Sequence, residues 1–219
     1  MAASEPQTLR TPLVLLAAVN LAVLGVLLWP WQEALNLPVG GTTAIDPAVS
    51  LLAYMGILFW IGSSNSESTR KALSSGAMLG LAAGLLLAVG VIVDVRMAAP
   101  PGYLQPALLG LAVILWGIAG LRGSQAAGNA GIGALAGMWS AMVSGLMACA
   151  AILAELYLAG PTANSPDLWK QYQGLAIGNA ATQGLVHSLD SATAFLLLGP
   201  LAGAIVGFVF AFFGQSKKG

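Results

Sequence analysis

Six long apolar stretches occupy most of this 219-residue chain, and short polar segments separate them. Each stretch approaches the ~20 residues that a helix needs to cross the ~30 Å hydrocarbon core of a bilayer. The pattern therefore predicts an all-α integral membrane protein, with residues 1–219 forming a single transmembrane helical domain. The predicted bundle has about six spans, over residues 12–31, 45–62, 72–93, 103–121, 131–158 and 191–214.

The first apolar stretch could in principle be a secretory signal, because Arg10 precedes it. No small-residue cleavage pattern follows it, however. The stretch ends in Trp29-Pro30-Trp31, an aromatic pair that suits a membrane interface. We therefore expect a helix that is retained in the mature protein.

The second apolar stretch is short and is diluted by polar and small residues. Asp46 followed by Pro47 predicts where its helix begins, since aspartate is a good N-cap and proline suits the first helical position. If this stretch did not cross the bilayer, the two ends of the chain would lie on opposite sides of the membrane.

Residues 160–190 form the longest connection between predicted spans. Ser165-Pro166-Asp167 has the residue types of a helix start, and apolar residues then recur at near-helical spacing among polar ones. This pattern predicts an amphipathic helix that lies in the outer membrane interface. The alternative is an extension of the sixth helix that stands clear of the membrane. The recurring apolar residues are Leu168, Tyr172, Leu175, Leu185 and Leu189.

The composition agrees with a membrane protein and excludes several classes of site. The chain is 58% hydrophobic and 7% charged, whereas soluble domains carry about 25% charged residues. Its formal net charge of zero gives no reason to expect nucleic acid as a partner. The single cysteine, Cys149, excludes a disulfide or a cysteine-rich metal site within one chain. We expect no metal and no cofactor. The expected partners are the lipid bilayer and either other membrane proteins or further copies of this chain.

The positive charges predict how the chain is oriented. With six spans and the N-terminus inside, six of the eight Lys and Arg residues fall on the inner side, and only Arg96 and Lys170 fall on the outer side. An excess of this kind marks the cytoplasmic side of short loops. The pattern predicts a plasma membrane protein of the bacterial inner-membrane kind, with both termini in the cytoplasm.

Small residues recur at every fourth position in three of the predicted spans, and residues four apart share one face of a helix. In lipid, such a face lets another backbone approach closely, and this packing is a main source of helix association. We expect the faces to be used inside the monomer, with an oligomeric contact as the alternative. The glycines of these stripes are Gly76, Gly80, Gly84, Gly133, Gly137, Gly145, Gly199, Gly203 and Gly207.

Ionisable residues inside a span are candidates for function, because burying them in lipid is costly. Here the ionisable groups lie at the ends of the spans, and Asp94, Glu155, His187 and Asp190 form the candidate outer polar cluster. The main buried polar residue is Asn20, for which an interhelical hydrogen bond is favoured over a role in transport. The near absence of buried charge argues against an ion-coupled pump.

The sequence His187-Ser188-Leu189-Asp190 contains the residue types of a hydrolase triad. These residues are too close together on one helix to assume triad geometry, and no Gly-x-Ser-x-Gly turn is present. A single histidine also excludes a bis-histidine haem and a zinc protease motif within one chain. We therefore predict no catalytic residue and interpret His187 as an interface histidine.

Pro200 should kink the sixth span and free a backbone carbonyl near Leu196, because proline has no N–H to donate. Broken helices form substrate sites in some transporters. The favoured function is nevertheless a non-catalytic subunit or scaffold of a membrane complex. The runner-up is a small oligomeric transporter or channel, and an intramembrane enzyme that uses the outer polar cluster is third.

Overall fold

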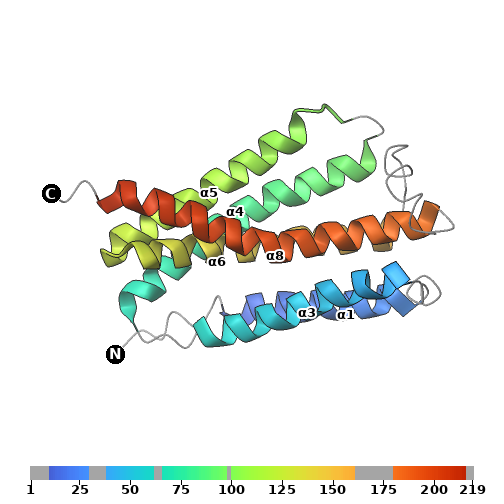
Figure 1. Ribbon diagram of the computed structural model, residues 1–219, viewed down its shortest axis with the longest axis horizontal. Helices are drawn as coiled ribbons and strands as arrows, with labels where there is room; N and C mark the ends of the chain where they lie inside the picture. Colours follow the sequence, from blue (N-terminus) through green and yellow to red (C-terminus); the bar gives the residue numbers. More distant parts are fainter. Residues whose placement is uncertain (1–9, 30–37, 62–65, 98–99, 161–179, 216–219) are drawn as a thin grey trace.

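The computed structural model describes residues 10–29, 38–61, 66–97, 100–160 and 180–215, and this part of the chain is almost entirely helical and contains no strand (Figure 1). Its helices run antiparallel to their neighbours in sequence, so α1 begins and α8 ends at the same end of the bundle. The helices are α1 (Arg10–Leu28), α3 (Pro38–Ile61), α4 (Glu67–Arg96), α5 (Leu104–Ala127), α6 (Ala130–Ala159) and α8 (Ala180–Gln215).

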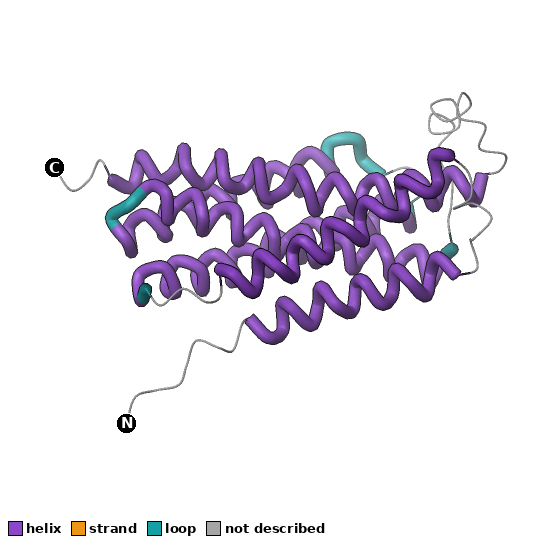
Figure 2. Tube along the Cα trace, turned by 60° about the horizontal axis from the view of Figure 1, so that its bottom comes forward, coloured by secondary structure: helices purple, strands orange, loops and turns teal. Residues whose placement is uncertain are grey.

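Helices α4, α5, α6 and α8 form a four-helix core, and α1 and α3 form a hairpin beside it (Figures 1 and 2). Within the core, α6 packs against each of the other three helices. The hairpin touches the core through α1 against α6 and through α3 against α8. Helix α6 is therefore the centre of the molecule, and most of its length is buried.

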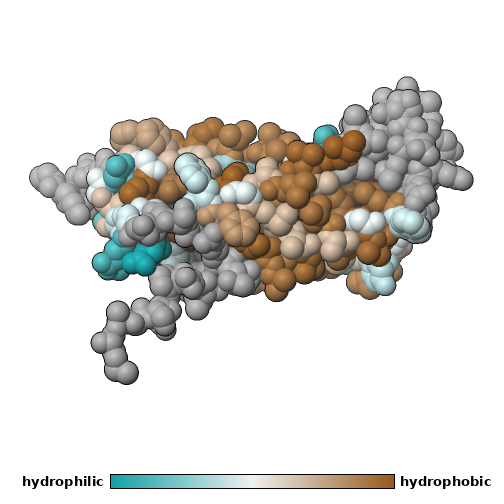
Figure 3. All heavy atoms as spheres, turned by 90° about the horizontal axis from the view of Figure 1, so that it is seen from below, coloured by the Kyte–Doolittle hydropathy of each residue, from teal (hydrophilic) through white to brown (hydrophobic). Residues whose placement is uncertain are grey.

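Four helices are long and apolar enough to cross a membrane, judged by length and composition: Glu67–Arg96, Leu104–Ala127, Ala130–Ala159 and Gln183–Gly214. The apolar parts of the hairpin helices, Pro12–Leu28 and Ile45–Trp60, are shorter. Large apolar side chains cover the outside of the bundle, and the hydrophilic surface gathers toward its ends (Figure 3). This distribution suits a bilayer and agrees with the predicted class of protein.

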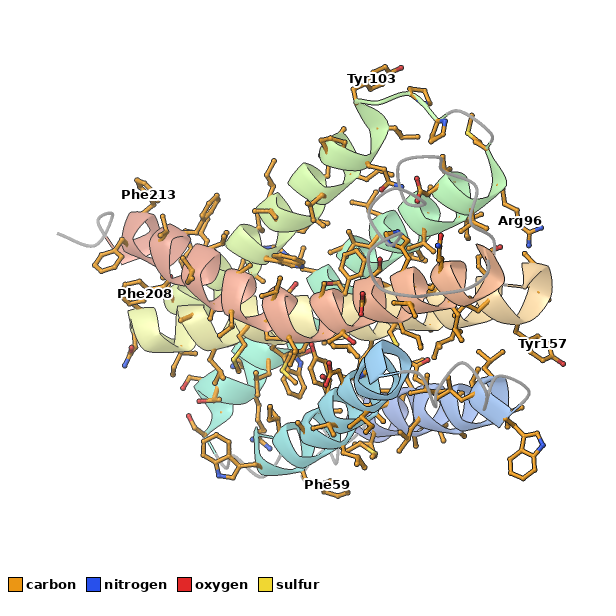
Figure 4. The ribbon with its side chains drawn as sticks, turned by 45° about the vertical axis from the view of Figure 1, so that its right-hand side comes forward. Phe59, Arg96, Tyr103, Tyr157, Phe208 and Phe213 are labelled. Atoms are coloured by element: carbon orange, nitrogen blue, oxygen red, sulfur yellow. The ribbon has the colours of Figure 1, made fainter. Side chains whose placement is uncertain are left out.

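Exposed aromatic side chains mark both ends of the apolar surface (Figure 4). Tyr103 and Tyr157 lie toward the end that carries Arg96, whereas Phe208 and Phe213 lie toward the opposite end. Aromatic residues at the two membrane–water boundaries are typical of membrane proteins. We call the end with Arg96 the predicted outer end.

The helix boundaries differ from the predicted ones at α3. This helix begins at Pro38, and Pro47 lies inside it, so the prediction that Asp46-Pro47 starts the helix was wrong. Proline removes one helical N–H but does not forbid the helix, especially where neighbouring groups compensate. Within the same helix the Ser50 hydroxyl donates to the Asp46 carbonyl at 2.7 Å, which is not the carbonyl, four residues before Pro47, that the proline leaves without its donor.

Helix α8 begins eleven residues before the predicted span, at Ala180 rather than at residue 191. Leu185 and Leu189 are buried in the same apolar cluster as Leu153 and Leu156 of α6. Residues 180–190 therefore extend the sixth helix, which was one of the two alternatives, and Leu185 and Leu189 pack against the core. The predicted helix start at residues 165–167 lies outside the described residues.

A tight turn joins α5 to α6, and its sequence explains both helix ends. Gly128 ends α5 with a φ of 65°, a left-handed conformation that glycine adopts without steric cost. Asn129 then caps α6, since its side-chain oxygen accepts a hydrogen bond from the Gly131 N–H at 2.7 Å. The short connection makes the two helices antiparallel neighbours.

Candidate functional site

The glycines of α4 lie against the backbone of α6. A Cβ atom added at Gly76 would come within 2.8 Å of the Ala136 carbonyl oxygen. One added at Gly80 would come within 2.8 Å of the Val143 Cβ and would also press on the Ser140 carbonyl. Because real Cβ atoms do not approach other heavy atoms this closely, only glycine permits the observed distance between α4 and α6.

The contact between α6 and α8 is equally close and involves glycines on both helices. A Cβ at Gly137 would meet the Gly207 Cα at 2.7 Å and the Gly203 carbonyl. A Cβ at Gly207 would lie 2.9 Å from both the Gly133 carbonyl oxygen and the Gly137 Cα. Helix α5 joins this contact because a Cβ at Gly120 would collide with the Gly207 backbone.

The remaining stripe glycines have different surroundings. Gly145 faces the Phe195 carbonyl oxygen, which a Cβ would approach to 2.9 Å. The atoms nearest to a Cβ at Gly84 belong to the Met147 side chain, whose sulfur can move away but whose Cβ, at 2.8 Å, is fixed to the backbone of α6. A Cβ at Gly199 would find its nearest neighbour, the Ala141 carbonyl oxygen, at 3.8 Å, an ordinary contact distance. Equal spacing in the sequence therefore corresponds to unequal room in the structure.

Three buried side chains donate hydrogen bonds around the middle of α6. The Asn20 amide of α1 donates to the Leu146 carbonyl at 3.0 Å. The Trp116 indole of α5 donates to the Ser144 hydroxyl, also at 3.0 Å. The Tyr54 hydroxyl of α3 donates to the Leu196 carbonyl of α8 at 2.8 Å, beside Gly145. The predicted interhelical role of Asn20 matches this arrangement.

The Leu196 carbonyl, which Pro200 was expected to leave free, accepts a hydrogen bond from the Tyr54 hydroxyl. Pro200 lies inside α8 and cannot donate to the carbonyl four residues earlier, that of Leu196. The Tyr54 hydroxyl supplies the missing donor from another helix. The helix continues past the proline, and its backbone acceptor stays satisfied.

The four residues of the candidate outer polar cluster differ in their surroundings. Glu155 is buried, and its carboxylate forms an ion pair with Arg96 of α4, with 2.9 Å between Nε and Oε2. Asp94 and Asp190 are exposed, and His187 is half-buried. No three His, Cys, Asp or Glu residues of the described ranges are placed so that they could hold a metal ion. These four residues therefore offer no shared metal site.

Several of the groups that join the helices could not be identified from the sequence. Trp116, Ser144 and Tyr54 lie within apolar stretches, where a lone polar group gives no indication of its partner. Arg96 was placed on the outer side but was not connected to Glu155. The available signal was weak: both residues sit at the outer ends of their helices, α4 and α6.

No protein-family model, curated protein or solved structure matches this chain at a significant level. The functional conclusion therefore rests on the arrangement of the residues alone. That arrangement joins helices through close backbone contacts and buried hydrogen bonds.

Proposed function

We propose that this protein is a non-catalytic subunit or scaffold of a membrane complex. The observation that carries the proposal is the close backbone packing of α4, α6 and α8 at Gly80, Gly137 and Gly207, which leaves no room for a side-chain carbon. A rigid bundle with a broad apolar surface is suited to organise neighbouring proteins in the bilayer. Asp, Glu, His, Lys and Arg are absent from the central third of the four core helices.

The full proposal includes six spans, with both termini in the cytoplasm of a bacterial-type inner membrane. The excess of positive charge on the inner side supports this orientation. The antiparallel course of the six helices supports it as well, since α1 begins where α8 ends.

Reporter fusions test this topology. A reporter that is active only in the cytoplasm should be active when fused after Gly219 and inactive when inserted within residues 161–179, because an odd number of spans separates the two sites. A reporter that is active only outside should give the reverse pattern. Activity on the same side at both positions would exclude the six-span arrangement.

A small oligomeric transporter or channel is the competing proposal, and it would use the stripes and the expected kink at Pro200 as its path. Two observations weigh against it. Neighbouring backbones pack closely against glycines of the stripes. The Leu196 carbonyl, which a substrate or ion would need as a ligand, already accepts a hydrogen bond from the Tyr54 hydroxyl. An exposed acceptor at a broken helix is the feature that serves transporters.

Isolation from native membranes in a mild detergent distinguishes the two proposals. We expect a particle in which the chain is bound to at least one different protein at a fixed ratio, measured by native mass spectrometry. The purified chain in liposomes should leak K⁺ no faster than empty liposomes. A particle made only of copies of this chain, together with faster leakage, would favour the channel.

A further inference from the structure

The α1–α3 hairpin meets the core in a different manner from the way the core helices meet one another. Its buried contacts are made by large side chains, among them Leu13, Leu24, Leu51 and Leu58. No glycine of the hairpin described at side-chain level is in close backbone contact: a Cβ added at Gly25 or at Gly56 would find nothing within 4 Å.

This difference matters because the surrounding medium is lipid. When two helices separate in a bilayer, lipid tails cover their apolar side chains again, so leucine contacts give little net drive for association. Hydrogen bonds are not replaced in this way, since the hydrocarbon contains no donors or acceptors. Two such hydrogen bonds join the described part of the hairpin to the core, from Asn20 to Leu146 and from Tyr54 to Leu196.

The two hydrogen bonds are not equivalent. The Leu146 carbonyl lies within the uninterrupted helix α6 and can bond along that helix as well. The Leu196 carbonyl lies four residues before Pro200 and has no such partner. If the hairpin left the core, both the Tyr54 hydroxyl and the Leu196 carbonyl would be unsatisfied. Of the two hydrogen bonds, the one from Tyr54 therefore stabilises the position of the hairpin more strongly.

We propose that the α1–α3 hairpin is a separable element of the fold, and that the Tyr54 hydroxyl holds it against the core at the backbone carbonyl that Pro200 leaves free. Gly145 makes room for this hydrogen bond, because a Cβ there would lie 3.4 Å from the Tyr54 hydroxyl oxygen and 2.9 Å from the Phe195 carbonyl oxygen. The hydrogen bonding of α8 before Pro200 and the position of the hairpin are consequently coupled.

Spin labels measure the coupling directly. Labels at the exposed positions Val19 of α1 and Ile114 of α5, in a Cys149→Ala background and in lipid nanodiscs, report the distance between hairpin and core. We expect one narrow distance distribution in the otherwise native protein. Tyr54→Phe should broaden it and shift it to longer distances. With Pro200→Ala in place, the residue 200 N–H can satisfy Leu196, so adding Tyr54→Phe should change the distribution little.

Two controls distinguish a specific release of the hairpin from a general loss of stability. Labels at the exposed positions Met78 of α4 and Ile205 of α8 report on the core alone and should be unaffected by Tyr54→Phe. Tyr157→Phe, the same change at an exposed position, should leave both distances unchanged. The proposal is overturned if Tyr54→Phe leaves the hairpin distance unaltered, disturbs the core distance equally, or has an undiminished effect beside Pro200→Ala.

Discussion

Replacing Gly137 with leucine should prevent the bundle from assembling. Even the first carbon of the new side chain would lie 2.7 Å from the Gly207 Cα, and a backbone cannot move aside as a side chain can. Overpacking of a core costs about 1–3 kcal/mol when side chains can adjust, so we expect a larger loss here. Gly80→Leu should behave similarly, because it faces the Ser140 backbone. The measurement is the fraction of protein that remains monodisperse after extraction and heating in detergent.

The chain supplies matched controls for this prediction. Gly25→Leu should be tolerated, since nothing lies within 4 Å of that position. Gly199→Ala should also be tolerated, although this glycine belongs to a stripe, because its nearest neighbour would be at 3.8 Å. Equal stability of Gly137→Leu and Gly25→Leu would mean that α6 and α8 do not pack as described.

Changing Asn20 to aspartate should destabilise the protein almost as strongly. The Asn20 amide is 2% exposed and donates to the Leu146 carbonyl. A carboxylate has no hydrogen to donate and would place a negative charge against that carbonyl oxygen. Leaving a buried charge without a partner costs about 3–5 kcal/mol. The expected result is a marked fall in the apparent melting temperature at neutral pH, followed in detergent or nanodiscs.

Two variants show whether the buried charge is the cause. Asn20→Leu removes the hydrogen bond without adding charge, and should cost only about 1 kcal/mol. Asn129→Asp makes the same chemical change at an exposed helix N-cap, where aspartate accepts the Gly131 N–H as well as asparagine does. It should leave stability unchanged. If Asn20→Asp were no worse than Asn20→Leu even at a pH high enough to ionise a buried carboxyl, Asn20 would have to face water rather than α6.

The small-residue stripes illustrate how far the sequence could predict the candidate site. Spacing by four is a property of the chain, so it identified which glycines share a helix face. It could not indicate which helix lies opposite each face, because any smooth face can pack against any other. Gly137 and Gly199 look alike in the sequence, and only the distance to the neighbouring backbone separates them.

Pro200 also shows which features the sequence predicts and which only the structure reveals. Its missing N–H is a covalent property, and it predicted a free carbonyl at Leu196 without reference to the fold. The donor to that carbonyl, Tyr54, is 142 residues from Leu196 in the chain, and nothing in either segment connects them. The extension of α8 back to Ala180 could only be given as one of two alternatives for a similar reason, since its leucines become buried only when α6 lies beside them.

The sequence by itself determined that the protein is helical and apolar enough for a membrane, since hydropathy and helical period are local properties of consecutive residues. It also determined which faces are smooth and where a backbone acceptor loses its donor. Only the tertiary structure decided that α6 is the central helix and that Arg96 pairs with Glu155. It also decided that the Tyr54 hydroxyl donates to the carbonyl that Pro200 leaves free. These pairings depend on which helices become neighbours, and that choice is made by the shapes of whole helix surfaces.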